Sequence, residues 1–188
     1  MQNCTDKELI EHINDRNSKA LSILYERYNL GVFNFVLRYT NNREIAEEVL
    51  QETFVRIWYA SHTYAPEKGS VKTWVFTIGL NITRNEMSLK RYSYQYVEYD
   101  DLLESENNGE ITELSNPVDI LENIELQDSI KHAISKLDPY LKEVVLLKHF
   151  HNLKFREIAE ITETPEGTLK ARFHKAINQL EKYLKKDI

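Results

Sequence analysis

Apolar residues recur every three or four positions through most of this chain, and this spacing constrains the fold more than any other feature. Between residues 21 and 39 they form one stripe: Leu21, Leu24, Tyr25, Tyr28, Val32, Phe35 and Tyr39. Such a stripe lies on one face of an α-helix, because a helix turns once in about 3.6 residues. Few positions show the β-branched alternation of strands. We therefore expect an all-α protein.

Helix boundaries are marked by residues that favour helix starts. These are the pairs Thr5 and Glu8, Asp138 and Pro139, and Thr164 and Pro165. Together with the periodicity, they predict a helix after Thr5 and a long helix around the stripe. Further helices are expected at about 43–59, 71–89, 155–162 and 165–185. Between the second and third of these, the pattern fails from about residue 92 and returns near residue 119.

Charge divides the 188 residues into three parts. The chain has a net charge of −6, but residues 1–88 carry −1, residues 89–128 carry −9 and residues 129–188 carry +4. The middle part lacks a helical period, so we expect an acidic linker at 91–128 between domains at 1–90 and 129–188. Four tyrosines make it an unusual linker: Tyr92, Tyr94, Tyr96 and Tyr99. They indicate either an extended segment that packs on a domain or a contact surface for a partner protein.

Several protein classes are disfavoured by the sequence. No apolar run approaches the roughly 18 residues that span a membrane, and the polar N-terminus lacks a signal-peptide core. A single cysteine, Cys4, rules out an intramolecular disulfide framework and a cysteine-based zinc site. Because HExxH, Walker-type and G-x-S-x-G motifs are missing, we expect no catalytic residue, no metal and no cofactor. We predict a cytoplasmic protein that is not an enzyme, with His149 and His151 as loop or core residues.

The segment TPEGTLKARFHKAINQL, residues 164–180, predicts the second helix of a helix-turn-helix. Its apolar residues share one arc with those that follow: Leu169, Phe173, Ala176, Ile177, Leu180, Tyr183 and Leu184. The opposite arc is cationic or polar and holds no acid: Thr168, Ala171, Arg172, His174, Lys175, Asn178, Gln179 and Lys182. Such a face suits a DNA major groove, with FREIAEIT as the supporting helix. The alternative is a four-helix packing module with a basic rim, and the cations equally fit phosphate clamps.

The helix expected at 43–59 presents an acidic face. Its apolar arc holds Ile45, Ala46, Val49, Leu50, Phe54, Ile57 and Trp58. The other side gathers Glu44, Glu47, Glu48, Gln51 and Glu52 around Val55. Like charges this close repel by about 0.2–0.5 kcal/mol per pair, and a basic partner would relieve the repulsion. The alternative is a face that only confers solubility.

Three motifs, in order, resemble those of bacterial sigma factors. AEEVLQETFVRIW is similar to the helix that binds core RNA polymerase, and GSVKTWVFTIGLNITRNEM is similar to the promoter-melting helix. LDPYLKEVVLLKHFHNLKFREIAEITETPEGTLKARFHKA resembles the C-terminal helix-turn-helix. The resemblance covers roughly residues 18–89 and 129–184. The two-domain layout is typical of the extracytoplasmic-function (ECF) group of the sigma-70 family, which implies a region 2-like helical bundle and a region 4-like helix-turn-helix.

The resemblance assigns residues to three surfaces. It implies that the clamp coiled coil of the largest core subunit is bound by Glu48, Gln51, Glu52 and Phe54. It implies that the minus-ten promoter element is read as a single strand by Lys72, Trp74, Asn81 and Arg84. The minus-thirty-five duplex contacts fall on Lys170, Ala171, His174 and Lys175, and the same face adds Thr168 and Arg172. The helical wheel agrees for the minus-ten helix, where a polar stripe holds Thr73, Thr77, Asn81 and Arg84 beside Trp74.

Some positions depart from the family pattern. Asn152 stands where a glycine is common, although asparagine also tolerates the left-handed turn conformation. Lys154 replaces the usual serine or threonine that opens the support helix. Ala171 and His174 are also unusual on the recognition helix. These changes leave the class intact and leave the promoter sequence open.

The resemblance carries implications for partners. It implies binding to core RNA polymerase and promoter DNA, without membrane insertion. The two-domain layout motivates the hypothesis that an anti-sigma protein, membrane-anchored forms included, holds the chain in check. The alternative function is a stand-alone helix-turn-helix transcription regulator with an N-terminal sensing or dimerisation domain. Such a regulator would need no acidic docking face and no long linker.

Overall fold

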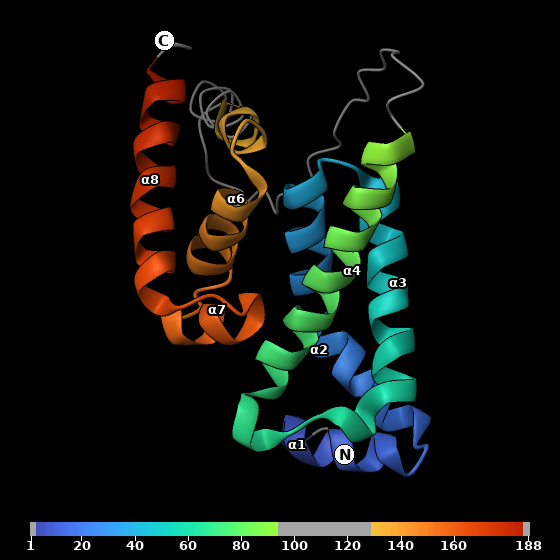
Figure 1. Cartoon of the computed structure of the whole chain (residues 1–188). Coiled ribbons are helices and arrows are strands. Elements are labelled where there is room, and N and C mark those ends of the chain that lie inside the picture. Colours follow the sequence, from blue (N-terminus) through green and yellow to red (C-terminus); the bar gives the residue numbers. More distant parts are fainter. Residues whose placement is uncertain (1–2, 94–128, 186–188) are drawn as a thin grey trace, which may run out of the picture.

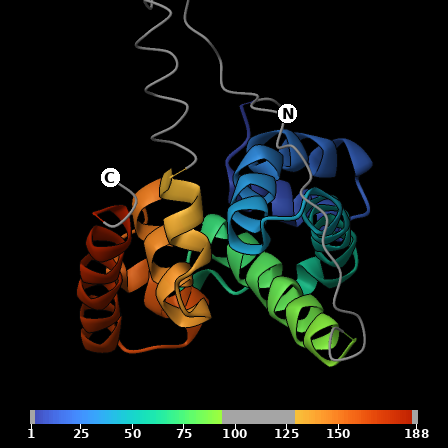
Figure 2. The ribbon, with the colours of Figure 1, turned by 90° about the horizontal axis from the view of Figure 1, so that it is seen from above.

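The computed structural model describes residues 3–93 and 129–185, and every regular element within them is helical. Figure 1 and Figure 2 show two groups of helices side by side, one from each half of the chain. The all-α fold with two helical parts is therefore confirmed. The expected linker at 91–128 is helical through residue 93, and the rest of it, with Tyr94, Tyr96 and Tyr99, lies outside the described residues.

The N-terminal group contains α1 (Asp6–Asn14), α2 (Ser18–Thr40), α3 (Arg43–Ala60), two short 3₁₀ turns (Ser61–Thr63 and Pro66–Lys68) and α4 (Val71–Ser93). The C-terminal group contains a helical stretch at 129–135, then α6 (Pro139–Val145), a π-helical turn (Leu146–Phe150), α7 (Phe155–Thr162) and α8 (Glu166–Leu184). The predicted helices at 43–59 and 155–162 match α3 and α7 to within one residue. The helix predicted at 71–89 continues four residues further.

Helix caps explain most of these boundaries. The backbone amide of Thr5 donates to the Glu8 carboxylate over 2.7 Å, and the Glu8 amide donates to the Thr5 hydroxyl, so the predicted capping box is confirmed. Those hydrogen bonds also lower the pKa of Glu8. The prediction of Thr164 as the cap of α8 is wrong by one residue. Pro165 occupies the cap position, and the Thr164 hydroxyl donates instead to the carbonyl of Thr162.

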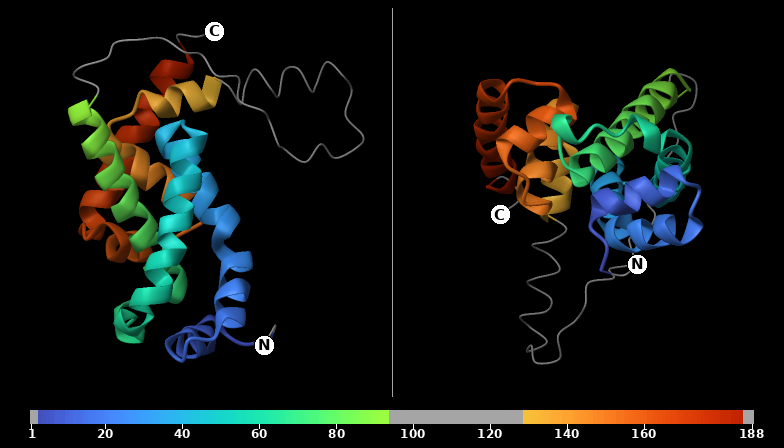
Figure 3. Two further views of the ribbon diagram at one scale, coloured as in Figure 1. Left: turned by 90° about the vertical axis from the view of Figure 1, so that its right-hand side faces the viewer. Right: turned by 90° about the horizontal axis from the view of Figure 1, so that it is seen from below.

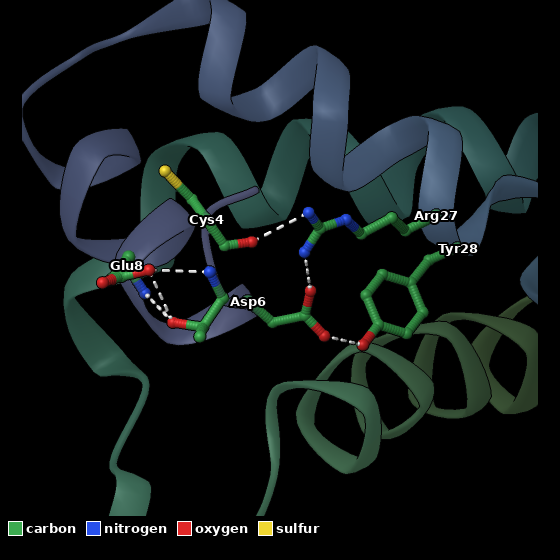
Figure 4. A network of polar contacts seen from close by, with 6 residues as sticks. Cys4, Asp6, Glu8, Arg27 and Tyr28 are labelled. Atoms are coloured by element: carbon green, nitrogen blue, oxygen red, sulfur yellow. Dashed lines mark hydrogen bonds and ion pairs between the residues drawn. The ribbon is translucent and has the colours of Figure 1, made fainter. Parts of the chain in front are cut away.

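A polar network fixes α1 against α2 (Figure 4). The carboxylate of Asp6, in the first turn of α1, accepts hydrogen bonds from Arg27 over 2.5 Å and from the hydroxyl of Tyr28. Arg27 also donates to the carbonyl oxygen of Cys4 over 2.8 Å. Burial, followed by the bond to Asp6, raises the pKa of Tyr28. The network holds α1 across the lower end of the bundle (Figure 3).

The C-terminal group forms a helix-turn-helix. Leu169 and Ala176 of α8 are buried against the neighbouring helices, whereas most of the polar arc of α8 is exposed. The loop before α7 passes through Asn152, whose φ of 52° is left-handed. The expectation that asparagine adopts this conformation in place of glycine is therefore confirmed. This turn sets the direction in which α7, and then α8, leave the loop.

The two groups pack directly on one another. His151 lies against Phe35 of α2 and Phe76 of α4, with ring centroids 5.9 and 4.8 Å apart. The turn before α4 approaches α7 so closely that a Cβ on Gly69 would lie 2.6 Å from a carboxylate oxygen of Glu160. One continuous set of buried apolar residues therefore joins the two halves, with Leu80 and Ile158 among its members.

Candidate functional site

The outer face of α3 is exposed and acidic, as the sequence predicts. Two of its acids are matched within the helix, because Arg43 pairs with Glu47 at 2.9 Å and Arg56 pairs with Glu52 at 2.7 Å. Glu48 and Gln51 are exposed and have no ion pair or side-chain hydrogen bond to any residue that the structure describes. Of the acids on this face, Glu44 and Glu48 therefore stay without an ion pair among the described residues.

An apolar groove of about 660 Å³ runs beside this acidic face, between α2 and α3. Its lining includes Ser18, Leu21, Tyr25, Glu47, Leu50, Gln51, Phe54, Val55, Trp58 and Tyr59. Val55 is 42% exposed and Tyr59 is 65% exposed, which is high for groups of this size. Tyr25 and Tyr59 were not predicted to be surface groups, and periodicity assigns Tyr25 to the core stripe.

The predicted role of Phe54 in this surface must be corrected. Phe54 was predicted to dock on a partner, but it is only 6% exposed. Its ring meets Tyr25 edge to face, with centroids 4.8 Å apart. Phe54 therefore lies at the base of the groove and supports Tyr25, while Gln51 lines the groove and Glu48 is exposed on the outer face of α3.

The four predicted minus-ten residues do not form one free surface on α4. Asn81 is exposed, and half-buried Trp74 packs on Tyr64 with ring centroids 5.6 Å apart. Lys72 and Arg84 instead bond to the C-terminal group of helices. Thr73, which was placed on the polar stripe, is buried and its hydroxyl is hydrogen-bonded to that of Ser70. Asn81 is thus the most accessible member of the predicted set.

A bidentate ion pair holds Arg84. Its Nε and Nη2 atoms donate to the two carboxylate oxygens of Glu143, over 2.9 and 2.8 Å. The Glu143 side chain is 6% exposed and also accepts a hydrogen bond from the hydroxyl of Tyr39 over 3.4 Å. The hydrogen bond to Glu143 raises the pKa of Arg84, and burial raises that of Tyr39. A polar arrangement this complete fixes α6 against α2 and α4.

A second polar contact joins the halves at the other end of α4. The ammonium group of Lys72 donates to the backbone carbonyl of His151 over 3.1 Å. Burial, with the charges of Lys72 and Arg38, lowers the pKa of the His151 imidazole to about 4. Its Nε2 atom is buried and has no hydrogen-bond partner among the residues that the structure describes. His151 is therefore a neutral, half-buried loop residue that packs on the core, which agrees with its prediction as a loop or core residue.

The recognition face of α8 remains open. Five of its six predicted DNA contacts are exposed: Thr168, Lys170, Ala171, His174 and Lys175. Arg172 is half-buried and lines a groove of about 1030 Å³ between the two halves, together with Tyr39, Arg84 and Tyr140. No acid lies among the exposed residues from Thr168 to Gln179. This surface can accept phosphate oxygens and base edges.

None of the described helices is both long and apolar enough to cross a membrane. Across residues 3–93 and 129–185, no three His, Cys, Asp or Glu side chains gather closely enough to hold a metal ion.

Comparison with known proteins gives matches along most of the chain. The family model described as Sigma-70 region 2 matches residues 24–92, and the one described as Sigma-70 region 4 matches residues 127–180. The ECF RNA polymerase sigma-E factor of Escherichia coli strain K12 is 27% identical over 175 residues, covering 92% of this chain and 90% of its own length. That of Haemophilus influenzae Rd is 27% identical over 181 residues, covering 94% of each.

Two solved structures share the fold. CnrH in complex with the cytosolic domain of CnrY has a TM-score of 0.71 at 20% identity, covering 97% of this chain and 99% of that chain. The sigma factor RpoE in complex with the anti-sigma factor NepR from Bartonella quintana also has a TM-score of 0.71 at 20% identity. This second match covers 90% of this chain and 99% of that chain.

Proposed function

Because the chain belongs to the ECF group of the sigma-70 family, we propose that its exposed surfaces act together to bring core RNA polymerase to promoters and to assist promoter melting. One observation carries this conclusion: the region 2 and region 4 models match in order, well over half of the chain in all. The alternative, a stand-alone transcription regulator, is not favoured, because it would not require the region 2 match. Sequence-specific direction of polymerase is therefore the function.

We propose that α3 and its groove form the polymerase-docking surface. Glu48 and Gln51 would supply polar contacts to a basic partner, with Glu52 beside them. Val55 and Tyr59 would supply apolar anchors, since large exposed apolar groups beside unpaired charge are typical of interfaces. Phe54 would act by shaping the groove.

We propose separate DNA roles for the two halves. Asn81 and Trp74 of α4, joined by Lys72 and Arg84 once these leave the C-terminal helices, would capture unstacked bases of the minus-ten element. The exposed face of α8 from Thr168 to Lys175 would contact the minus-thirty-five duplex. In this assignment, residues 1–90 and 129–188 are the two binding domains, and residues 91–128 join them.

The chain contributes binding, and RNA synthesis belongs to the polymerase, so we assign it no enzymatic role. We place it in the cytoplasm, where it would meet polymerase and promoters. We also propose an anti-sigma protein as its regulator. The structure of the sigma factor RpoE with the anti-sigma factor NepR supports this proposal, because that sigma factor shares this fold.

Transcription with purified components tests the function. Bacterial core polymerase would be incubated with genomic DNA of the source organism, with and without the chain, and the 5′ ends of the transcripts would be mapped. We expect new start sites that share two upstream sequence elements at fixed spacing. Start sites unchanged from those of core polymerase alone would contradict the proposal.

A further inference from the structure

Tyr140, in the first turn of α6, touches two cations of the recognition helix. The guanidinium carbon of Arg172 lies 5.2 Å from the centroid of the Tyr140 ring, and the ammonium of Lys175 lies 5.7 Å from it. Lys175 also donates a hydrogen bond to the Tyr140 hydroxyl over 3.3 Å. One aromatic side chain from outside α8 therefore contacts two of the six predicted minus-thirty-five contacts.

Tyr140 is itself held in place. Its hydroxyl donates to the carboxylate of Asp138 over 3.0 Å. A hydroxyl has one proton, so the bond to Asp138 leaves its lone pairs for Lys175. Pro139 starts α6 at this point, and Leu141 and Val145 pack α6 against α8. The ring position is thus fixed relative to the recognition helix.

The arrangement offsets a cost of presenting two cations together. Arg172 and Lys175 are three residues apart on α8, so they lie on neighbouring parts of one face and repel each other. Both side chains are long, and ordering them on DNA costs conformational entropy. The negative face of the Tyr140 ring attracts Arg172, and the Tyr140 hydroxyl accepts a hydrogen bond from Lys175, so both cations are partly ordered before DNA arrives. Arg172 is steadied further by a 3.5 Å contact with the Thr164 hydroxyl.

A second aromatic residue provides a contrast. The ring of Phe155 in α7 lies near Lys148 and Lys170, at 5.2 and 6.0 Å. Phe155 packs edge to face on Phe173, and Lys170 is also 3.8 Å from Glu166. Phe155 therefore has a packing role in the domain, whereas Tyr140 is 38% exposed and contacts α8 chiefly through its cations.

We propose that Tyr140 is a positioning residue for recognition of the minus-thirty-five duplex, acting through Arg172 and Lys175. The inference rests on the proposed function and deepens it. Tyr140 was not predicted from the sequence, because its effect depends on a contact between α6 and α8 that periodicity does not reveal. Tyr140 touches no DNA in this role, and its effect is on the geometry and mobility of the two cations.

The test uses the full chain bound to core polymerase. The wild-type holoenzyme first selects a minus-thirty-five sequence from a pool of random duplexes. Affinity is then measured for the selected duplex and for a scrambled one. Tyr140→Leu removes both ring contacts, so we expect roughly fivefold weaker binding to the selected duplex and a smaller preference over the scrambled one. Tyr140→Phe keeps the ring and loses only the hydroxyl contacts, so we expect roughly a twofold loss.

Controls separate positioning from folding. Core binding and the melting temperature should be unchanged in Tyr140→Leu, since a merely structural role would alter these instead. Tyr183→Leu is the matched control, because the Tyr183 ring lies 5.7 Å from Lys136, outside the predicted DNA face. Arg172→Ala should also cost less affinity in the Tyr140→Leu background than in the wild type.

An equal preference for the selected duplex over the scrambled one in wild type and Tyr140→Leu would overturn this inference and leave the proposed function standing. So would an equal loss of affinity for both duplexes. A wild-type chain that binds no core polymerase and selects no duplex would overturn the proposed function, and this inference with it.

Discussion

His151 shows how a single residue ties the two halves together. It lies against Phe35 and Phe76, and its carbonyl accepts a hydrogen bond from Lys72. Its Nε2 atom is buried and has no hydrogen-bond partner within 3–93 and 129–185. A charged imidazole at this position would be buried near Lys72 and Arg38. Burial and these two charges therefore keep it neutral, with a pKa of about 4 instead of 6.5.

This shift predicts a loss of stability in acid. Between pH 6.5 and 4 the unfolded chain binds a proton at His151 and the folded chain does not, so stability falls as the pH drops through that window. The loss should approach about 3 kcal/mol at pH 4. His151→Phe keeps the ring and removes the titration. We expect its melting temperature to depend less on pH between 7.5 and 5 than that of the wild type.

The exposed His149 provides a control for that measurement. His149→Phe should keep the full pH dependence of the wild type, because its side chain lies outside the interface. If the melting temperature of His151→Phe falls as steeply in acid as that of the wild type, the assignment of the effect to His151 is wrong.

For single residues, the local backbone conformation could be predicted from the sequence, whereas contacts with residues distant in the chain could not. The left-handed Asn152 and the Thr5–Glu8 capping box followed from conformational preference and spacing. Burial of Phe54 followed from its place on the apolar arc, but its predicted docking role came from the family motif. The pairing of Arg84 with Glu143 joins residues 59 positions apart and depends on how two bundles dock. A helical period carries no information about that.

The helices themselves were largely predictable. The bounds of α3 and α7 follow from apolar spacing, and α3 also has a polar cap, since the Asn42 side chain accepts from the Ile45 amide over 2.9 Å. The start of α8 was misplaced by one residue because Pro165 fits either the cap or the first turn. A helical wheel does not predict that the C-terminal helices cover part of α4.

The exposed arc of α8 makes a prediction about salt. Each phosphate contact adds about one unit to the slope of log affinity against log salt. We expect Lys175→Ala and Lys170→Ala each to lower that slope by about one for holoenzyme on its selected promoter. Lys182→Ala is the matched control, because it removes the same charge near the far end of the helix. A full slope in both variants would mean that neither lysine contacts a phosphate.

The two groups of helices pack on each other in a way that covers part of the proposed DNA-binding surface. Arg84 and Lys72 are assigned to the minus-ten element, yet Glu143 and the carbonyl of His151 hold them in this structure. The same contacts place α6 and α7 against the N-terminal group, with the recognition helix α8 on their far side (Figure 1). For Arg84 to reach DNA, its ion pair with Glu143 must break, so promoter binding should separate the halves.

Glu143→Gln should favour that separation. The change keeps the size of the side chain but removes the charge that Arg84 binds. We expect it to weaken docking by about 1–2 kcal/mol, less than for a fully buried pair because Arg84 is 38% exposed. Small-angle scattering should report a larger radius of gyration, and binding to single-stranded minus-ten DNA should tighten. Glu181→Gln, on the exposed surface of α8, should leave both unchanged, and a compact Glu143→Gln chain would contradict the account.

The most direct test of the assignment is titration of the labelled chain with purified bacterial core RNA polymerase. The wild type would be compared with a Glu48→Lys/Gln51→Ala variant, and with Glu11→Lys on α1 as a control for the change of charge. The account predicts tight one-to-one binding by the wild type and Glu11→Lys, and its loss in the double variant. Absence of wild-type binding, or equal binding by the double variant, would contradict the docking surface on α3.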